Sequence, residues 1–166
     1  MRKIIVTATL VAGICVAGIN TAAAADFYWA GSSDMEHIAI LDPSTISAAP
    51  GGHKTFHLAD ISAFTLWTDT TIEVDCGGNQ MRMTSIINHL AGGDAMDLSS
   101  FNKDVNVWHT LQPGLQIDGA DLVQTRDLVC KYPDQKPTGN QVMSFPNFQA
   151  AMEAVSKIIT DKKEAK

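Results

Sequence analysis

Histidine side chains are the first groups in this 166-residue chain that could bind a metal or move a proton. The five histidines are His37, His53, His57, His89 and His109. His53 and His57 are four residues apart, a spacing that suits metal ligation on a helix. Their surroundings predict a loop entering a strand, where this spacing places both on one face. Two ligands alone make a poor metal site, so we expect no metal there.

Met81 and Met83 are spaced like the methionines that bind soft Cu(I) in exported proteins. No third methionine stands beside them, and two thioethers on one side of a strand are typical of a hydrophobic core. The catalytic motifs Gly-x-Ser-x-Gly and His-Glu-x-x-His are absent from the sequence. We therefore predict no catalytic residue, no cofactor and no enzymatic activity. The alternative is a small periplasmic enzyme or metal-handling protein whose site forms only on folding.

Cys76 and Cys130 are the two cysteines that remain once an N-terminal leader is removed. A redox pair usually has the spacing Cys-x-x-Cys, and zinc needs about four ligands at short spacing. Neither pattern is present. In a small exported domain an even pair of cysteines predicts a disulfide, here closing a loop of about 54 residues. Such a bond stabilises the fold by about 4 kcal/mol in the chain-entropy model.

The first 25 residues predict that leader. Arg2 and Lys3 are followed by an apolar run over residues 4–19, and small residues follow at 21–25. This order is typical of a secretory signal peptide.

We place the signal cleavage between Ala25 and Asp26, with cuts after Ala23 or Ala24 as alternatives. The apolar run is shorter than the about 20 residues of a membrane-spanning helix. Cys15 lies inside the run and follows a large residue, so we expect it to be discarded with the leader rather than lipidated. The mature protein is therefore predicted to be a periplasmic or secreted bacterial protein with no stable membrane anchor.

Acidic side chains outnumber basic ones by 18 to 12, which gives a formal net charge of −6. Residues 1–25 hold two of the basic residues and none of the acidic ones, so the mature chain carries a net charge of −8. We expect no binding to nucleic acid or to anionic membranes, since phosphate contacts require clustered Lys and Arg. Residues 26–166 are enough for a single domain with its own core.

The first cysteine falls in a predicted strand. Residues 70–76 alternate between apolar and polar side chains, with Ile72, Val74 and Cys76 on one face. A Gly-Gly-Asn turn at 77–79 then leads into a second strand and makes a hairpin.

The second cysteine falls in a predicted helix. Asp118 is the expected N-cap, with Asp121 in the first turn beside the positive end of the helix dipole. Two pairs of residues seven apart share one side of this helix: Leu122 with Val129, and Val123 with Cys130. The disulfide is therefore expected to hold a helix to the buried face of a sheet.

Further strands are expected where β-branched and aromatic residues gather. They lie at residues 27–30, 36–41, 54–67, 80–86 and 105–108. Turns rich in Pro, Gly, Asp and Ser are expected at 42–46, 48–52 and 112–114. Residues 87–103 are predicted to be mostly loop.

The C-terminal segment, about residues 146–163, is predicted to be a helix. Its apolar residues form one stripe at helical spacing: Phe148, Ala151, Met152, Val155, Ile158 and Ile159. Such a stripe is typical of a helix docked on the protein's own sheet. It is also a candidate surface for self-association into a homo-oligomer.

Several short segments carry a resemblance by their order along the chain: Leu41–Ile46, Glu73–Cys76, Met81–Met83, Trp108 with Pro113–Gly114, and Leu128–Cys130. That order, with the paired cysteines, resembles the surface-adhesin protein E family of exported bacterial proteins over about residues 27–130. The resemblance implies an α+β fold: an antiparallel sheet of about six strands, with a disulfide-tethered helix on its concave face. The C-terminal helix is additional to this pattern.

The named member of that family is a surface adhesin that binds host matrix and serum proteins. The resemblance therefore implies an exported, non-enzymatic binding or accessory protein, adhesin-like in character. Its disulfide-rigidified sheet would present loops or an edge strand to another protein. This chain lacks the lipidation site of the family pattern, and no binding residue is carried over to it.

Overall fold

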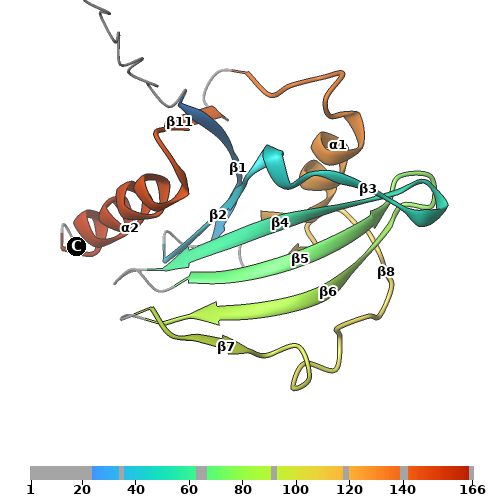
Figure 1. The fold of residues 1–166 in the computed structure, drawn as a ribbon, viewed down its shortest axis with the longest axis horizontal. Coiled ribbons are helices and arrows are strands. Elements are labelled where there is room, and N and C mark those ends of the chain that lie inside the picture. Colours follow the sequence, from blue (N-terminus) through green and yellow to red (C-terminus); the bar gives the residue numbers. More distant parts are fainter. Residues whose placement is uncertain are drawn as a thin grey trace, which may run out of the picture.

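The computed structural model describes residues 24–33, 36–62, 67–90, 93–117, 120–138 and 142–164. Within these ranges the chain forms one mainly antiparallel sheet of eleven strands and two α-helices (Figure 1). The predicted α+β class is confirmed. The expected count of about six strands is too low, because the sheet also recruits six strands of only two to four residues.

Five long strands form the body of the sheet: β1 (Ala25–Ser33), β2 (His37–Leu41), β4 (His53–Ser62), β5 (Trp67–Asp75) and β6 (Gln80–His89). The short strands are β3 (Ser47–Ala49), β7 (Ala95–Asp97), β8 (His109–Thr110), β9 (Gln116–Ile117), β10 (Ala120–Asp121) and β11 (Val142–Phe145). The spatial order is β7-β6-β5-β4-β2-β1-β10-β9, while β11 pairs with β1, β3 with β4 and β8 with β6. The helices are α1 (Leu122–Lys131) and α2 (Phe148–Glu164), with short 3-10 turns η1 (Pro43–Thr45) and η2 (Pro50–Gly52).

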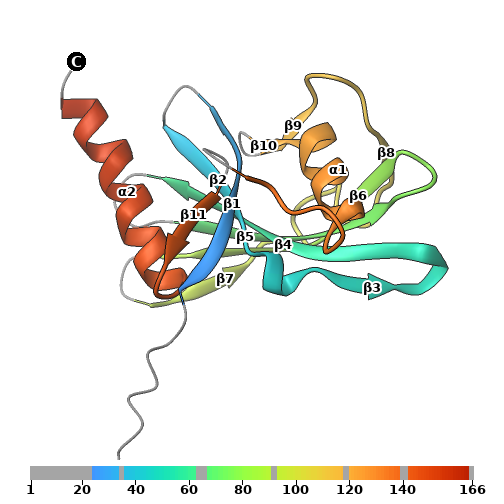
Figure 2. The same cartoon turned by 90° about the horizontal axis from the view of Figure 1, so that it is seen from above.

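The middle of the sheet is buried on both faces. In β2, successive side chains point to opposite sides, so that Leu41 enters one core and Ile40 the other. The core under α1, here the α1 core, consists of Tyr28, Ala39, Leu41, Phe56, Leu58, Ile72, Val74, Met81, Leu111, Ala120, Leu122 and Val129. The core under α2, the α2 core, consists of Phe27, Ile38, Ile40, Ala59, Ile61, Ala151, Met152, Val155 and Ile159. Figure 2 shows the two helices apart, α1 above β4 to β6 and α2 beside β2 and β11.

The prediction of a single strand over 54–67 is wrong. β4 ends at Ser62, and Trp67 already belongs to β5, which runs back antiparallel and places Trp67 opposite Ile61. Residues 63–66 lie outside the described residues. Their sequence, Ala-Phe-Thr-Leu, contains none of the Gly, Pro, Asn or Asp residues that mark a turn, so the reversal left no local signal.

The region after β6 also differs from expectation. The expected loop over 87–103 contains the end of β6 and the strand β7, whose three residues are all exposed and so show no apolar alternation. The expected strand over 105–108 is replaced by one isolated parallel bridge between Val105 and Met83. The strand residues in this region are those of β8, which begins at His109, directly after the expected strand.

Helix α1 starts later than predicted. Its N-cap is Asp121, whose side chain accepts hydrogen bonds from the backbone N–H groups of Val123 and Gln124 at 3.0 Å. The predicted cap, Asp118, lies outside the described residues. Leu122 and Val129 are buried in the α1 core, as their seven-residue spacing predicted.

The disulfide between Cys76 and Cys130 is present, with a Cα–Cα distance of 5.6 Å. It joins the end of β5 to the last turn of α1. Both cysteines pack against the α1 core, so the bond ties the helix to the face of the sheet that it covers.

Lys54 on β4 makes a second attachment to the same end of α1. Its Nζ donates to the carbonyl oxygens of Val129, Cys130 and Tyr132 at 3.0, 3.2 and 2.5 Å. The last carbonyls of a helix lack partners within the helix, and they carry the negative end of its dipole. A half-buried ammonium group therefore caps α1 from the sheet.

Helix α2 confirms the predicted C-terminal helix and its docking face. Ala151, Met152, Val155 and Ile159 are buried against the sheet, while Ile158 at the margin of the stripe is 42% exposed. Neither helix in the described ranges combines the length and apolar character needed to cross a bilayer.

Replacing both Cys76 and Cys130 with serine should lower the free energy of unfolding by about 4 kcal/mol, because the loop then regains its freedom in the unfolded chain. Urea unfolding of the oxidised wild type and of the double variant measures the difference. Two free thiols in the denatured, unreduced wild type would contradict the bond.

Replacing Lys54 with methionine keeps the apolar stem but removes the ammonium that caps α1. We expect the free energy of unfolding to fall by about 1–3 kcal/mol. Lys157→Met, at an exposed position of α2, is the matched control and should change little. Equal losses in the two variants would show that Lys54 does not cap the helix.

Candidate functional site

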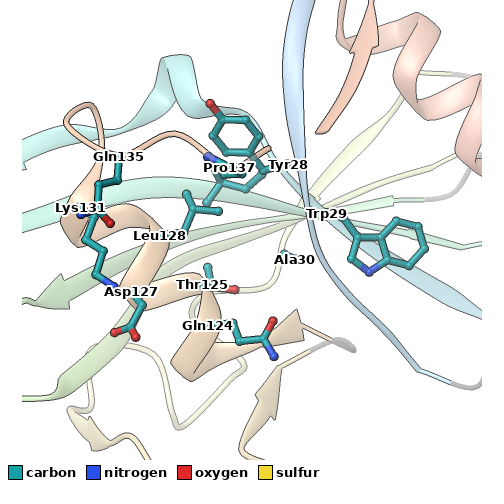
Figure 3. A pocket seen from close by; sticks show the side chains of 11 residues that line it. Tyr28, Trp29, Ala30, Gln124, Thr125, Asp127, Leu128, Lys131, Gln135 and Pro137 are labelled. Atoms are coloured by element: carbon teal, nitrogen blue, oxygen red, sulfur yellow. The ribbon is translucent and has the colours of Figure 1, made fainter. Parts of the chain in front are cut away.

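A cleft of about 380 Å³ lies between α1 and β1 (Figure 3). Its walls come from β1, the end of β2, α1 and the segment that follows α1. The described residues that line this α1 cleft are Tyr28, Trp29, Ala30, Leu41, Gln124, Thr125, Asp127, Leu128, Lys131, Gln135 and Pro137. Its volume lies within the range of about 300–1,000 Å³ that is usual for small-ligand sites.

The two walls follow from helix and strand periodicity. Gln124, Leu128 and Lys131 are separated by four and three residues, so they form one row along α1. On β1, neighbouring side chains alternate: Tyr28 belongs to the α1 core, whereas Trp29 points to the other side of the strand (Figure 3). The cleft therefore lies between α1 and β1, next to the α1 core to which both elements contribute.

Tyr28 contributes an aromatic ring to the lining of the cleft. It is 3% exposed, and its ring meets that of Tyr132 edge-on with centroids 6.4 Å apart. Burial raises the pKa of the Tyr28 hydroxyl, and the nearby Tyr132 and Asp26 raise it further. The phenol therefore stays neutral at physiological pH and can both donate and accept a hydrogen bond.

The remaining lining groups are mixed in character. Gln124 and Gln135 are exposed amides that donate and accept, and Leu128 offers an apolar contact. Asp127 and Lys131 add one charge of each sign. Groups of this kind bind a ligand reversibly through hydrogen bonds and surface contact.

A second polar assembly lies on the face of β5 and β6 that points away from α1. Glu73 is 8% exposed and binds His53 and Arg82 at once. Its Oε1 accepts from His53 Nδ1 at 2.7 Å, and its Oε2 accepts from Arg82 Nε and Nη2 at 2.9 and 2.6 Å. Trp108 covers the group, with Arg82 4.8 Å from its ring centroid and the His53 ring edge-on at 5.1 Å. We call these four residues the Glu73 cluster.

The Glu73 cluster was missed in the sequence. Its available signal is a pair of opposite charges that face each other across the hairpin, since Glu73 and Arg82 are register partners. Burial alone raises the pKa of the Glu73 carboxyl, but the hydrogen bonds from His53 and Arg82 outweigh it and leave the pKa below its ordinary value. Glu73 is thus held as a buried carboxylate.

The two histidines considered as metal ligands do not come together. His53 binds Glu73, whereas His57 binds Asp69, with Nδ1 3.2 and 3.1 Å from the two carboxylate oxygens. The part of the chain that the structure describes contains no group of three or more His, Cys, Asp or Glu residues placed to hold a metal ion.

The other predicted residues are placed as follows. Met81 and Met83 are buried at 1% and 9% exposure, as expected for core side chains. Ala25 is the first residue of β1, and Asp26 accepts a hydrogen bond from the Ser144 hydroxyl at 2.6 Å. Residues 1–23 lie outside the described residues, so the leader and the cleavage between Ala25 and Asp26 stay predictions.

Comparison of the chain with protein-family models, with curated proteins and with solved structures finds no match. The resemblance to the surface-adhesin protein E family stays a prediction.

Changing Glu73 to glutamine should make stability less dependent on pH in the acid range. A carboxylate whose pKa is lowered by folding stabilises the protein above its ordinary pKa, and this contribution is lost as the pH falls through the lowered value. The wild type should therefore exceed Glu73→Gln in unfolding free energy at pH 7, and the gap should shrink towards pH 3. Urea unfolding across this range measures both proteins, with Glu153→Gln on the exposed side of α2 as control. A gap that is constant with pH would contradict the ionic role of Glu73.

Proposed function

We propose that the protein is an exported, non-enzymatic binding protein of the surface-adhesin protein E type, and that the α1 cleft takes part of a protein partner. The observation that carries this proposal is the cleft itself, about 380 Å³ in volume, with one wall fixed to the sheet. That wall is α1, whose last turn is attached by the disulfide to Cys76 and by the hydrogen bonds of Lys54.

The attachment of α1 to the sheet favours binding, because less of the protein then has to become ordered when a ligand binds. Association loses free energy whenever side chains and segments become fixed on binding. A helix already held at its C-terminal end, and capped by Asp121 at its start, avoids most of that loss.

The chemistry of the cleft suits a segment of polypeptide. The amides of Gln124 and Gln135 match the donors and acceptors of a peptide backbone. Leu128 and Pro137 provide apolar contact for a side chain. A cavity of this size accommodates one or two side chains of a partner rather than a folded domain.

The proposed location is the periplasm or the extracellular space. A leader of the order basic, apolar and small residues supports export. The disulfide supports an oxidising compartment, where such bonds form and persist.

Filling the cleft should remove binding. Gln124→Trp places an indole at its exposed rim, and Gln149→Trp makes the same change at an exposed position of α2. The wild type and both variants are immobilised and incubated with the exported protein fraction, and captured proteins are identified and then titrated in purified form. We expect at least one protein to bind the wild type and Gln149→Trp equally, and Gln124→Trp at least tenfold more weakly. Identical capture by all three proteins, or no capture by any, would contradict the proposal.

A further inference from the structure

A separate cavity of about 280 Å³ lies on the opposite face of the sheet, lined by residues of β2, β4 and β5 and by Phe148 at the start of α2. We propose that this α2 pocket binds an aliphatic ammonium group, either on a free diamine or on a lysine side chain. The pocket shares no lining residue with the α1 cleft, so the proposal is independent of the function proposed above.

Two carboxylates give the pocket its charge. Asp42 is the N-cap residue of η1, and Asp69 lies on β5. None of the described residues that line the pocket is Lys or Arg. The side chain of Asp42 accepts from the backbone N–H of Ser44 at 2.8 Å, a neutral donor that leaves its charge in place. Asp69 accepts from His57, whose Nδ1 lies 3.2 and 3.1 Å from its two carboxylate oxygens.

Apart from Thr45 and His57, the remaining lining residues are apolar. Ile40 and Ala59 are buried at 0% and 5% exposure, and they belong to the α2 core. Trp67 and Phe148 complete the pocket, with their rings edge-on at a centroid distance of 5.0 Å. The methylene stem of an alkylamine can therefore lie against apolar surface while its charged end reaches a carboxylate.

The dipole of α2 does not cancel this preference. Phe148 opens the helix, and the positive end of a helix corresponds to about half a unit charge. The first turn already has an acceptor in Asn147, which receives the N–H of Ala150 at 2.9 Å. The two carboxylates of Asp42 and Asp69 outweigh this half charge, even with a further unit charge on His57.

The volume of the pocket limits which organic cations can fit into it. Sites for drug-sized ligands have volumes of about 300–1,000 Å³, and this pocket lies just below that range. A four-carbon chain with a terminal amine is a matching ligand, and it occurs both in small diamines and in the lysine side chain. The ammonium group that we propose as ligand can therefore come from a small diamine or from a lysine side chain.

Calorimetric titration of the full chain distinguishes the sources. The probes are 1,4-diaminobutane, Nα-acetyl-lysine amide and the neutral isostere 1,4-butanediol. We expect at least one amine to bind at millimolar concentration or below, and the diol to bind at least tenfold more weakly. Binding of the diamine alone would identify a free amine as the ligand, and binding of the lysine derivative alone would identify a lysine side chain.

Charge removal then tests the site. Asp69→Asn and Asp42→Asn each keep the oxygen that accepts the local hydrogen bond but lose the charge, and each should weaken amine binding by about tenfold or more. Asp94→Asn makes the same change of net charge at an exposed position before β7, and it should bind like the wild type. Thermal unfolding shows which variants are folded. If only one of the two pocket variants folds, that variant alone tests the site.

Three outcomes would overturn the proposal. They are no amine binding by the wild type, equal binding of amine and diol, and equal weakening in Asp94→Asn and the pocket variants.

Discussion

Burial of β2 and of residues 58–61 of β4 on both faces is the constraint on which the rest of the structure depends. Side chains of a strand alternate, so a segment covered on both sides is mostly apolar, and Asp60 is the buried polar exception in β4. One face must then be covered by α1 and the other by α2. A shift of register by one residue would exchange the two sets of side chains, and each helix would meet a surface shaped for the other.

The two helices are held in different ways. α1 is short, at ten residues, and it is attached by a covalent bond and a half-buried ammonium as well as by packing. α2 has 17 residues and docks mainly through its apolar stripe. A short helix is marginal in water on its own, and the additional attachments are made to the shorter of the two helices. The walls of the two cavities differ in the same way. The α1 cleft has a wall attached by the disulfide, whereas the helix beside the α2 pocket is held mainly by packing.

The features that could be predicted from the sequence depend on local periodicity or on a scarce residue type. The alternation around Ile72 and Val74 placed Cys76 correctly, and the stripe of α2 placed its buried face. Reversals without turn residues, such as the connection between β4 and β5, left no comparable pattern. The Glu73 cluster and the two cavities depend on strand register, which brings residues such as His53 and Glu73 together from positions 20 apart.

Adjacent residues of β2 line different cavities: Leu41 lines the α1 cleft and Ile40 the α2 pocket. A single strand is therefore the partition between them. The alternation that buries both faces also makes each face available for a separate site.

The pairing of β1 with β11 has a consequence for the order of folding. β11 lies opposite the first four residues of β1, and the hydrogen bond between Ser144 and Asp26 spans 118 positions. A polypeptide is synthesised from its N-terminus, so β1 is made first and β11 with α2 last. The α2 core combines Phe27 of β1 with side chains of α2, and Met143 and Phe145 of β11 pack against it, so it cannot close until nearly the whole chain has been made.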